Sequence, residues 1–88
     1  MNVYILKVYR YSNLHREDSY IDLVYENEED AWNRIEEKLI SFIKAIVETG
    51  YKIREIKIEN TTVTCSYEKF IDDMYGEITY EIHVRYVH

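Results

Sequence analysis

The stretch from residue 27 to residue 50 constrains the fold more than any other part of the chain, because it carries the start, the period and the end of one long helix. Asn27 is a good N-cap residue, since its side-chain oxygen can accept a hydrogen bond from a free N–H group of the first turn. Gly50 stands where a left-handed residue often ends a helix. Between them, apolar residues recur at steps of three and four and form one stripe: Ala31, Trp32, Ile35, Leu39, Phe42, Ile43 and Ile46.

The residues before this helix predict two strands. Residues 3–11 carry apolar side chains at both odd and even positions, so we expect a central strand that is covered at least partly on each face. A polar loop follows, and residues 19–26 then alternate as a second strand. In this strand we expect Ile21, Leu23 and Tyr25 on the core side. We expect Tyr20, Asp22 and Val24 on the side that faces away.

The residues after the helix predict three more strands. Residues 51–59 have strand character, but their apolar phase changes near Arg54, which predicts either a β-bulge or a late strand start there. Residues 62–67 alternate as the fourth strand. Residues 68–76 fit either one turn of helix or a wide connection. Residues 78–87 alternate most strictly of all and predict the last strand.

The order of the elements, β-β-α-β-β-β, predicts a single α+β domain over residues 1–88, with one long helix packed on a five-stranded, mostly antiparallel sheet in two layers. The first and last strands are the longest and most apolar, so we place them side by side in the middle. This gives the sheet order second, first, fifth, fourth and third strand. The helix covers one sheet face, and one side of the other face is expected to carry Val3, Ile5, Tyr9, Tyr20 and Val24.

The charge balance argues against two classes of partner. A net charge of −6 disfavours direct binding of nucleic acid or of an anionic membrane surface, because both need clustered Lys and Arg.

Cys65 is the only cysteine, so no internal disulfide can form and a cytoplasmic location is expected. No apolar run approaches the length of a membrane span, and the first residues lack the features of a signal peptide.

The residues that usually carry catalysis are few. His15 falls in a polar loop, His88 ends the chain and His83 lies on an outward strand position with no evident partner. Cys65 falls on an inward strand position, where thiols are usually inert. No acidic cluster has the spacing of a calcium loop, and no glycine-rich phosphate loop is present. We therefore expect a protein that is not an enzyme and that needs no metal or other cofactor.

Tyrosines and carboxylates are the remaining candidates for function. Ten tyrosines are present, and Tyr is a frequent anchor at protein interfaces. Acidic residues gather at the start of the helix and before the last strand. The candidate partner-binding residues are Tyr9, Tyr11, Tyr20, Glu29, Asp30, Glu36, Glu37, Asp72 and Asp73. A purely structural interpretation stays open, because helix starts favour acids and strands favour Tyr in any protein.

The first half of the chain resembles small proteins of phages and prophages. The residues that carry the resemblance are the strand 3–6, the strand 20–25 and the acidic, Ala-containing helix start at 26–31. The composition, rich in Ile, Lys, Glu, Asn and Tyr, is similar to that of low-GC bacteria and their phages. Small acidic phage proteins include anti-CRISPR proteins and other inhibitors of host defence, some of which act as DNA mimics. This class is diverse, so the resemblance assigns no functional residue.

These observations predict a small non-enzymatic inhibitor that binds and blocks a host protein, such as a CRISPR or other nucleic-acid-handling defence complex. Its location would be the host cytoplasm. The alternative is a small structural or assembly protein that self-associates as a homodimer through the uncovered sheet face, where Val3, Ile5, Tyr9 and Val24 would form an apolar patch.

Overall fold

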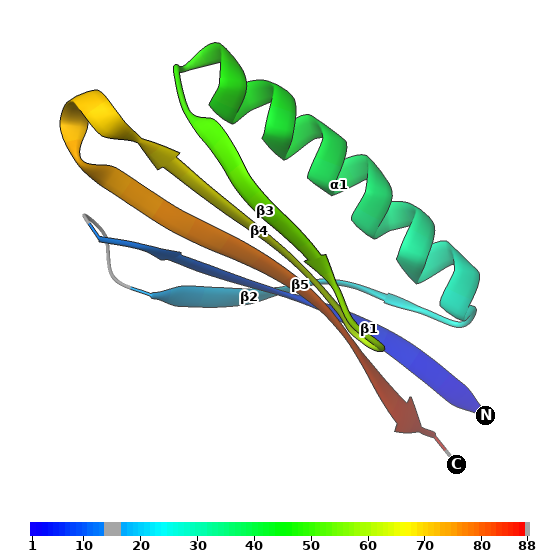
Figure 1. The fold of residues 1–88 in the computed structure, drawn as a ribbon. Helices are drawn as coiled ribbons and strands as arrows, with labels where there is room; N and C mark the ends of the chain where they lie inside the picture. Colours follow the sequence, from blue (N-terminus) through cyan, green and yellow to red (C-terminus); the bar gives the residue numbers. More distant parts are fainter. Residues whose placement is uncertain (14–16, 88) are drawn as a thin grey trace.

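The computed structural model describes residues 1–13 and 17–87, apart from the side chain of Asp72, and shows one helix lying across one face of a five-stranded sheet (Figure 1). The elements are β1 (Asn2–Ser12), β2 (Asp18–Tyr25), α1 (Glu28–Glu48), β3 (Lys52–Ile58), β4 (Thr62–Lys69), the 3₁₀ turn η1 (Phe70–Asp72) and β5 (Met74–Tyr86). All neighbouring strands are antiparallel, in the order β2-β1-β5-β4-β3. The predicted fold class and strand order are confirmed. His15 and His88 lie outside the described residues.

Both ends of α1 are capped as the sequence predicts. The Asn27 side-chain oxygen accepts hydrogen bonds from the backbone N–H groups of Glu29 at 2.8 Å and Asp30 at 3.4 Å. At the other end Gly50 has a φ of 94°, in the left-handed region where glycine is favoured. Its N–H donates to Val47 O, and the next N–H, of Tyr51, donates to Ile46 O, both at 3.0 Å. This pair of bonds is the Schellman arrangement, so the helix ends in a fixed geometry.

The sheet is built around β1 and β5, which pair along their whole length from Asn2 opposite Tyr86 to Ser12 opposite Gly76. Of the two alternatives near Arg54, the bulge is correct, because β3 already begins at Lys52 and its register against β4 shifts between Ile53 and Glu55. Of the two alternatives for residues 68–76, the helical turn is correct, as the short turn η1. β5 begins earlier than predicted, because its first residues continue the ladder with β4.

The prediction for the two faces of β2 is wrong around residue 21. The register of β1 against β2 shifts between Leu6 and Lys7, which leaves Asp22 as a bulged residue. Ile21 therefore lies on the uncovered face and is 60% exposed, whereas Tyr20 lies on the helix side. The cause is tertiary: the Asp22 carboxylate turns toward α1 and accepts from Arg34 Nε at 3.2 Å and Lys38 Nζ at 3.0 Å.

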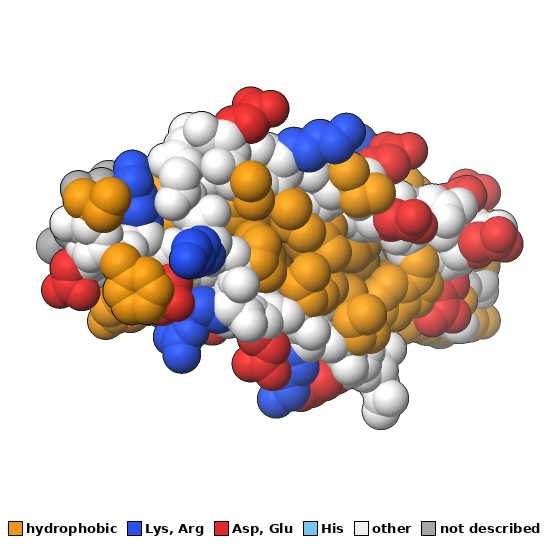
Figure 2. Space-filling model, turned by 45° about the horizontal axis from the view of Figure 1, so that its top comes forward, with side chains coloured by type: hydrophobic (Ala, Val, Ile, Leu, Met, Phe, Trp, Pro, Cys, Tyr) orange, Lys and Arg blue, Asp and Glu red, His pale blue; other side chains and the backbone are white. Residues whose placement is uncertain are grey.

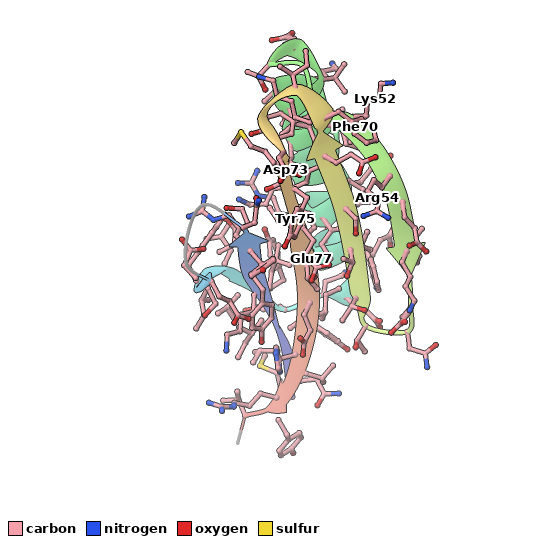
Figure 3. All side chains as sticks on the ribbon, turned by 60° about the vertical axis from the view of Figure 1, so that its left-hand side comes forward. Lys52, Arg54, Phe70, Asp73, Tyr75 and Glu77 are labelled. Carbon is pink, nitrogen blue, oxygen red and sulfur yellow. The ribbon has the colours of Figure 1, made fainter. Side chains whose placement is uncertain are left out.

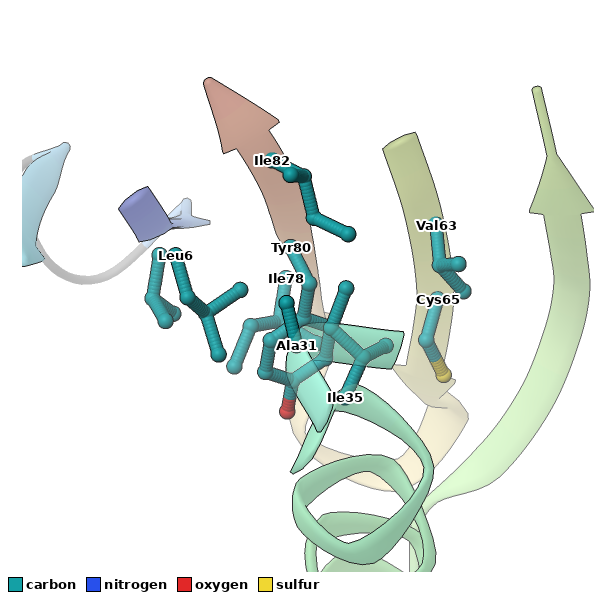
Figure 4. Close-up of a cluster of buried hydrophobic side chains, with 9 residues drawn as sticks. Leu6, Ala31, Ile35, Val63, Cys65, Ile78, Tyr80 and Ile82 are labelled. Carbon is teal, nitrogen blue, oxygen red and sulfur yellow. The ribbon is translucent and has the colours of Figure 1, made fainter. Parts of the chain in front are cut away.

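The core is a thin layer between α1 and the three middle strands. Figure 4 shows its members, which are Leu6, Val8, Ala31, Ile35, Val63, Cys65, Ile78, Tyr80 and Ile82. Tyr80 is only 2% exposed and Cys65 is fully buried. Burial raises the pKa of the Tyr80 hydroxyl and the pKa of the Cys65 thiol above their ordinary values, because their charged forms are poorly solvated there.

These raised pKa values make the fold sensitive to alkaline pH. The unfolded chain loses these protons near the ordinary values of 9.0 for the thiol and 10.0 for the phenol, while the folded protein keeps them. The free energy of unfolding should therefore be fully retained below pH 9.0 and decline above it, by up to about 1.4 kcal/mol per pH unit for each group. Urea unfolding at a series of pH values measures this. Tyr80→Phe should flatten the decline, and an unchanged slope would contradict the assignment.

A second prediction concerns Gly76, at the point where β1, β4 and β5 meet. A Cβ atom there would lie 2.5 Å from the Tyr67 hydroxyl oxygen and 2.6 Å from the Tyr11 carbonyl oxygen. Gly76→Ala should lower the free energy of unfolding by about 1–3 kcal/mol, because the sheet backbone cannot yield. Adding Tyr67→Phe should relieve only a small part of this loss, since the Tyr11 carbonyl and the ring carbon Cζ of residue 67, at 2.7 Å, both remain. A Gly76→Ala variant as stable as the parent would show that the strands can separate there.

Candidate functional site

The most unusual surface lies at the end of the sheet where β4 turns into β5. We call it the tip surface and define it as Tyr11, Phe70, Ile71, Asp73 and Tyr75. Phe70 is 76% exposed and Ile71 is 93% exposed, although both are large apolar residues. Figure 3 shows Phe70 and Asp73 at the turn, with Tyr75 and Glu77 further along β5. Side chains of this kind exposed together are typical of binding surfaces.

Asn13, at the end of β1, holds the tip surface in place. Its side-chain amide donates to the Asp73 carbonyl at 2.8 Å, and its side-chain oxygen accepts from the Tyr75 N–H at 3.0 Å. Its own backbone N–H donates to the Tyr75 carbonyl at 3.1 Å. Asp73 adopts a left-handed conformation with a φ of 50°, which Asp tolerates better than most residues. Three hydrogen bonds of Asn13 therefore hold the turn between β4 and β5, in which Phe70 and Ile71 are exposed to solvent.

Two tyrosines of the tip surface lie against each other. The rings of Tyr11 and Tyr75 are tilted, with centroids 6.5 Å apart, and they are 42% and 46% exposed. The pKa of Tyr11 is raised, first by its hydrogen bond with the Tyr75 hydroxyl and further by the charges of Glu77 and Glu17. The Tyr11 hydroxyl therefore stays neutral at physiological pH. Both rings offer apolar faces with polar ends, as interface tyrosines do.

The tip surface has a rigid support underneath. Tyr67 packs edge-on against Phe42 and Tyr51, with ring centroids 5.4 Å apart in each case. The Tyr51 hydroxyl contacts the Met74 sulfur at 3.4 Å. A shallow hollow of about 180 Å³ opens beside these rings, lined in part by Tyr11, Tyr75 and Gly76. Pre-ordered aromatic residues lose little conformational entropy on binding, so this arrangement suits a protein partner.

The structure separates the sequence-predicted site residues. Tyr11 and Asp73 belong to the tip surface, and the Asp72 side chain lies outside the described residues. Glu29, Asp30, Glu36 and Glu37 lie on α1, whose start is near the chain termini, at the other end of a molecule 51 Å long (Figure 1). Tyr9 lies on the uncovered sheet face, half-buried, with the Lys7 ammonium 5.1 Å from its ring centroid.

Tyr20 borders a different feature, an open hollow of about 620 Å³ between α1 and the β1–β2 side of the sheet. The charged ends of Arg10 and Lys38 lie 5.6 Å and 5.5 Å from its ring centroid. Each cation lining the hollow has an acidic partner: Arg10 pairs with Asp18, while Arg34 and Lys38 pair with Asp22. Glu37 also lines the hollow and pairs with Arg34 at 3.4 Å, so three carboxylates balance the three cations and the hollow presents no excess charge to a ligand.

The sequence prediction missed Phe70, Ile71 and Asn13 as site residues. Two adjacent large apolar residues inside an otherwise polar connection were a usable indication, since a short loop without partners rarely needs them. Asn13 gave no such indication, because its partners lie 60 and 62 residues away.

Comparisons with protein-family models, with curated proteins and with solved structures find no match. Over residues 1–13 and 17–87, no group of three or more His, Cys, Asp or Glu side chains could hold a metal ion. Within the same residues, no helix is long and apolar enough to cross a membrane.

Proposed function

We propose that this protein is a small non-enzymatic inhibitor of the phage type, which binds a host protein through the tip surface and blocks it. The observation that carries the proposal is the exposure of Phe70 and Ile71 beside the Tyr11–Tyr75 pair, on a turn ordered by Asn13. Binding energy at interfaces concentrates in a few aromatic and apolar anchors that fill pockets on the partner. The tip surface supplies such anchors on a rigid base.

The charge of the protein indicates the kind of partner. Asp73 belongs to the tip surface and Glu77 follows it on β5, in a chain with a net charge of −6. A nucleic-acid-handling defence protein carries a basic surface, which attracts an acidic protein and raises the rate of encounter. The tip surface would then bind beside or within the basic groove and exclude nucleic acid from it.

The first test is capture of a partner by variants of the tip surface. The parent protein should retain one stoichiometric partner from the lysate of a suitable bacterial host, identified by mass spectrometry. Phe70→Ser with Ile71→Ser should abolish this capture, because it removes the apolar anchors. The matched control is Ile21→Ser with Val24→Ser, which alters two other exposed apolar residues, both on β2. Capture that survives the tip variant but not the control would contradict the proposal.

The second test measures association rates with the captured partner. Attraction between exposed charges is screened over a Debye length of ~8 Å at physiological salt, so the association rate should fall as salt rises. Glu77→Lys should slow association further. Glu36→Lys with Glu37→Lys asks whether the helix acids contribute as well, as a DNA mimic would require. If the association rate changes neither with salt nor with any of these charge reversals, the partner surface is not basic. Binding would then depend on the apolar anchors alone.

A second candidate function, a self-associating structural or assembly protein, is favoured by the bulge in β2. The bulge places Ile21 on the uncovered sheet face with Val24, and both are more than half exposed. Ile5 lies opposite Val24 on the same face and is half-buried. Light scattering decides this: self-association that Ile21→Ser with Val24→Ser removes would support an assembly role.

A further inference from the structure

The outer edge of β3 is open to solvent along its length. β3 is the last strand of the sheet order and pairs only with β4 among the described residues. An open edge presents unpaired N–H and C=O groups and can accept another strand. On its helix side this edge carries Ile56, which is 43% exposed, and Ile58, which is 73% exposed. Among the described residues, β3 thus combines an edge without a strand partner with two apolar side chains that are partly and largely exposed.

The neighbouring flank of α1 is also apolar. One flank of the helix, with Arg34 and Lys38, lines the hollow toward β2. The opposite flank faces β3 and carries Ile40 and Val47, which are 47% and 52% exposed. Ile40 and Val47 are seven residues apart in the sequence, with Ile43 between them, so they lie in one row along the helix. Figure 2 shows hydrophobic side chains gathered in a broad band across one face, with charged side chains around it.

The charges of β3 alternate in sign on the other face of the strand. Glu55 and Lys57 both lie there, opposite Ser66 and Thr64 of β4. If two copies of β3 pair antiparallel with the two Ile56 residues opposite each other, Glu55 of each copy faces Lys57 of the other. Opposite charges directly across a strand pair stabilise it, and two such pairs form at once because of the twofold symmetry.

From this pattern we propose that a second copy of this chain pairs with β3 edge to edge, centred on Ile56. The two sheets then form one continuous ten-stranded sheet, and the two copies of α1 lie side by side over it. Ile40, Val47, Ile56 and Ile58 become covered. This interface is distinct from the tip surface and from the uncovered sheet face, and it does not depend on the proposed function.

Other pairings of this edge are less favourable. Moving the centre to Lys57 places Glu55 opposite Glu59 of the second copy, and moving it to Glu55 sets the two Glu55 side chains against each other. The bulge at Arg54 interrupts the strand toward its start, which also favours the stretch from Glu55 onward. The opposite edge strand, β2, has no Lys or Arg, and its acids Asp18 and Asp22 already pair with Arg10, Arg34 and Lys38, so two copies of β2 gain no such complementary contacts.

The charge pattern gives a reversible test. In sedimentation or light-scattering experiments the parent protein should be a dimer. Glu55→Lys alone, or Lys57→Glu alone, should raise the dissociation constant on the order of tenfold or more, because two like-charged pairs replace two attractive ones. Glu55→Lys combined with Lys57→Glu should restore the dimer, because the pattern is again complementary. The proposal would be overturned if neither single reversal changes the dissociation constant of the dimer. It would also be overturned if the double reversal does not restore the dissociation constant of the parent protein.

Cysteine cross-linking tests the register independently. In Ile56→Cys the two new thiols would face each other across the symmetry axis, within the Cα separation that a disulfide requires. Mild oxidation should therefore give a covalent dimer. Ile58→Cys is the matched control, since its two copies would stand four residues apart along the pair and cannot join. Cys65 is fully buried and present in both. Equal cross-linking of the two variants, or a parent protein that stays monomeric at every concentration, would overturn the proposal.

Folding must be checked alongside. Circular dichroism of each variant should match that of the parent, because all four substituted side chains are exposed. Self-association that Ile21→Ser with Val24→Ser abolishes, while the β3 reversals leave it intact, would also overturn the β3 interface in favour of the uncovered face.

Discussion

The pairing of β1 with β5 is the interaction on which the rest of this structure depends. It sets Asn2 beside Tyr86 and Ser12 beside Gly76, so it joins the two ends of the chain along the middle of the sheet. Leu6 and Val8 from one strand and Ile78, Tyr80 and Ile82 from the other then form the floor of the core. β2 pairs with the other edge of β1, and the β3–β4 hairpin pairs with β5 through β4. Among the described residues, one α-helix covers one face of this sheet, so both edge strands and the other face are exposed to solvent.

This arrangement explains why the protein has several distinct surfaces despite its small size. Five strands are too wide for one helix, so α1 leaves an open hollow toward β2 and an apolar flank toward β3. The length of the central strands places the tip surface far from the start of α1. The acids of the helix and the aromatic residues of the tip surface can therefore contact different molecules, or different parts of one large partner.

The elements that could be predicted from the sequence are those that local interactions determine. Asn27 and Gly50 act within a few residues of themselves, so the bounds of α1 could be predicted closely. An irregularity near Arg54, either a bulge or a late strand start, could be predicted because the apolar phase itself changes there. The bulge at Asp22 could not, because it depends on a contact with Arg34 and Lys38 that exists only in the folded protein. The ordering of the tip surface by Asn13 could not be predicted either, because Asn13 acts on residues that are distant in sequence, and residue-by-residue patterns do not report such contacts.

The position of β5 also has a consequence for how the chain folds. β5 follows every other strand in the sequence, yet it lies between β1 and β4 in the sheet. During synthesis the β1–β2 hairpin, α1 and the β3–β4 hairpin emerge first, and each lacks the strand that joins it to the others. Closing contacts across almost the entire chain is slow, because the loop entropy is lost before the contacts form. The nascent protein thus keeps apolar strand edges uncovered until its last strand is made, which is the period in which it is most prone to aggregate.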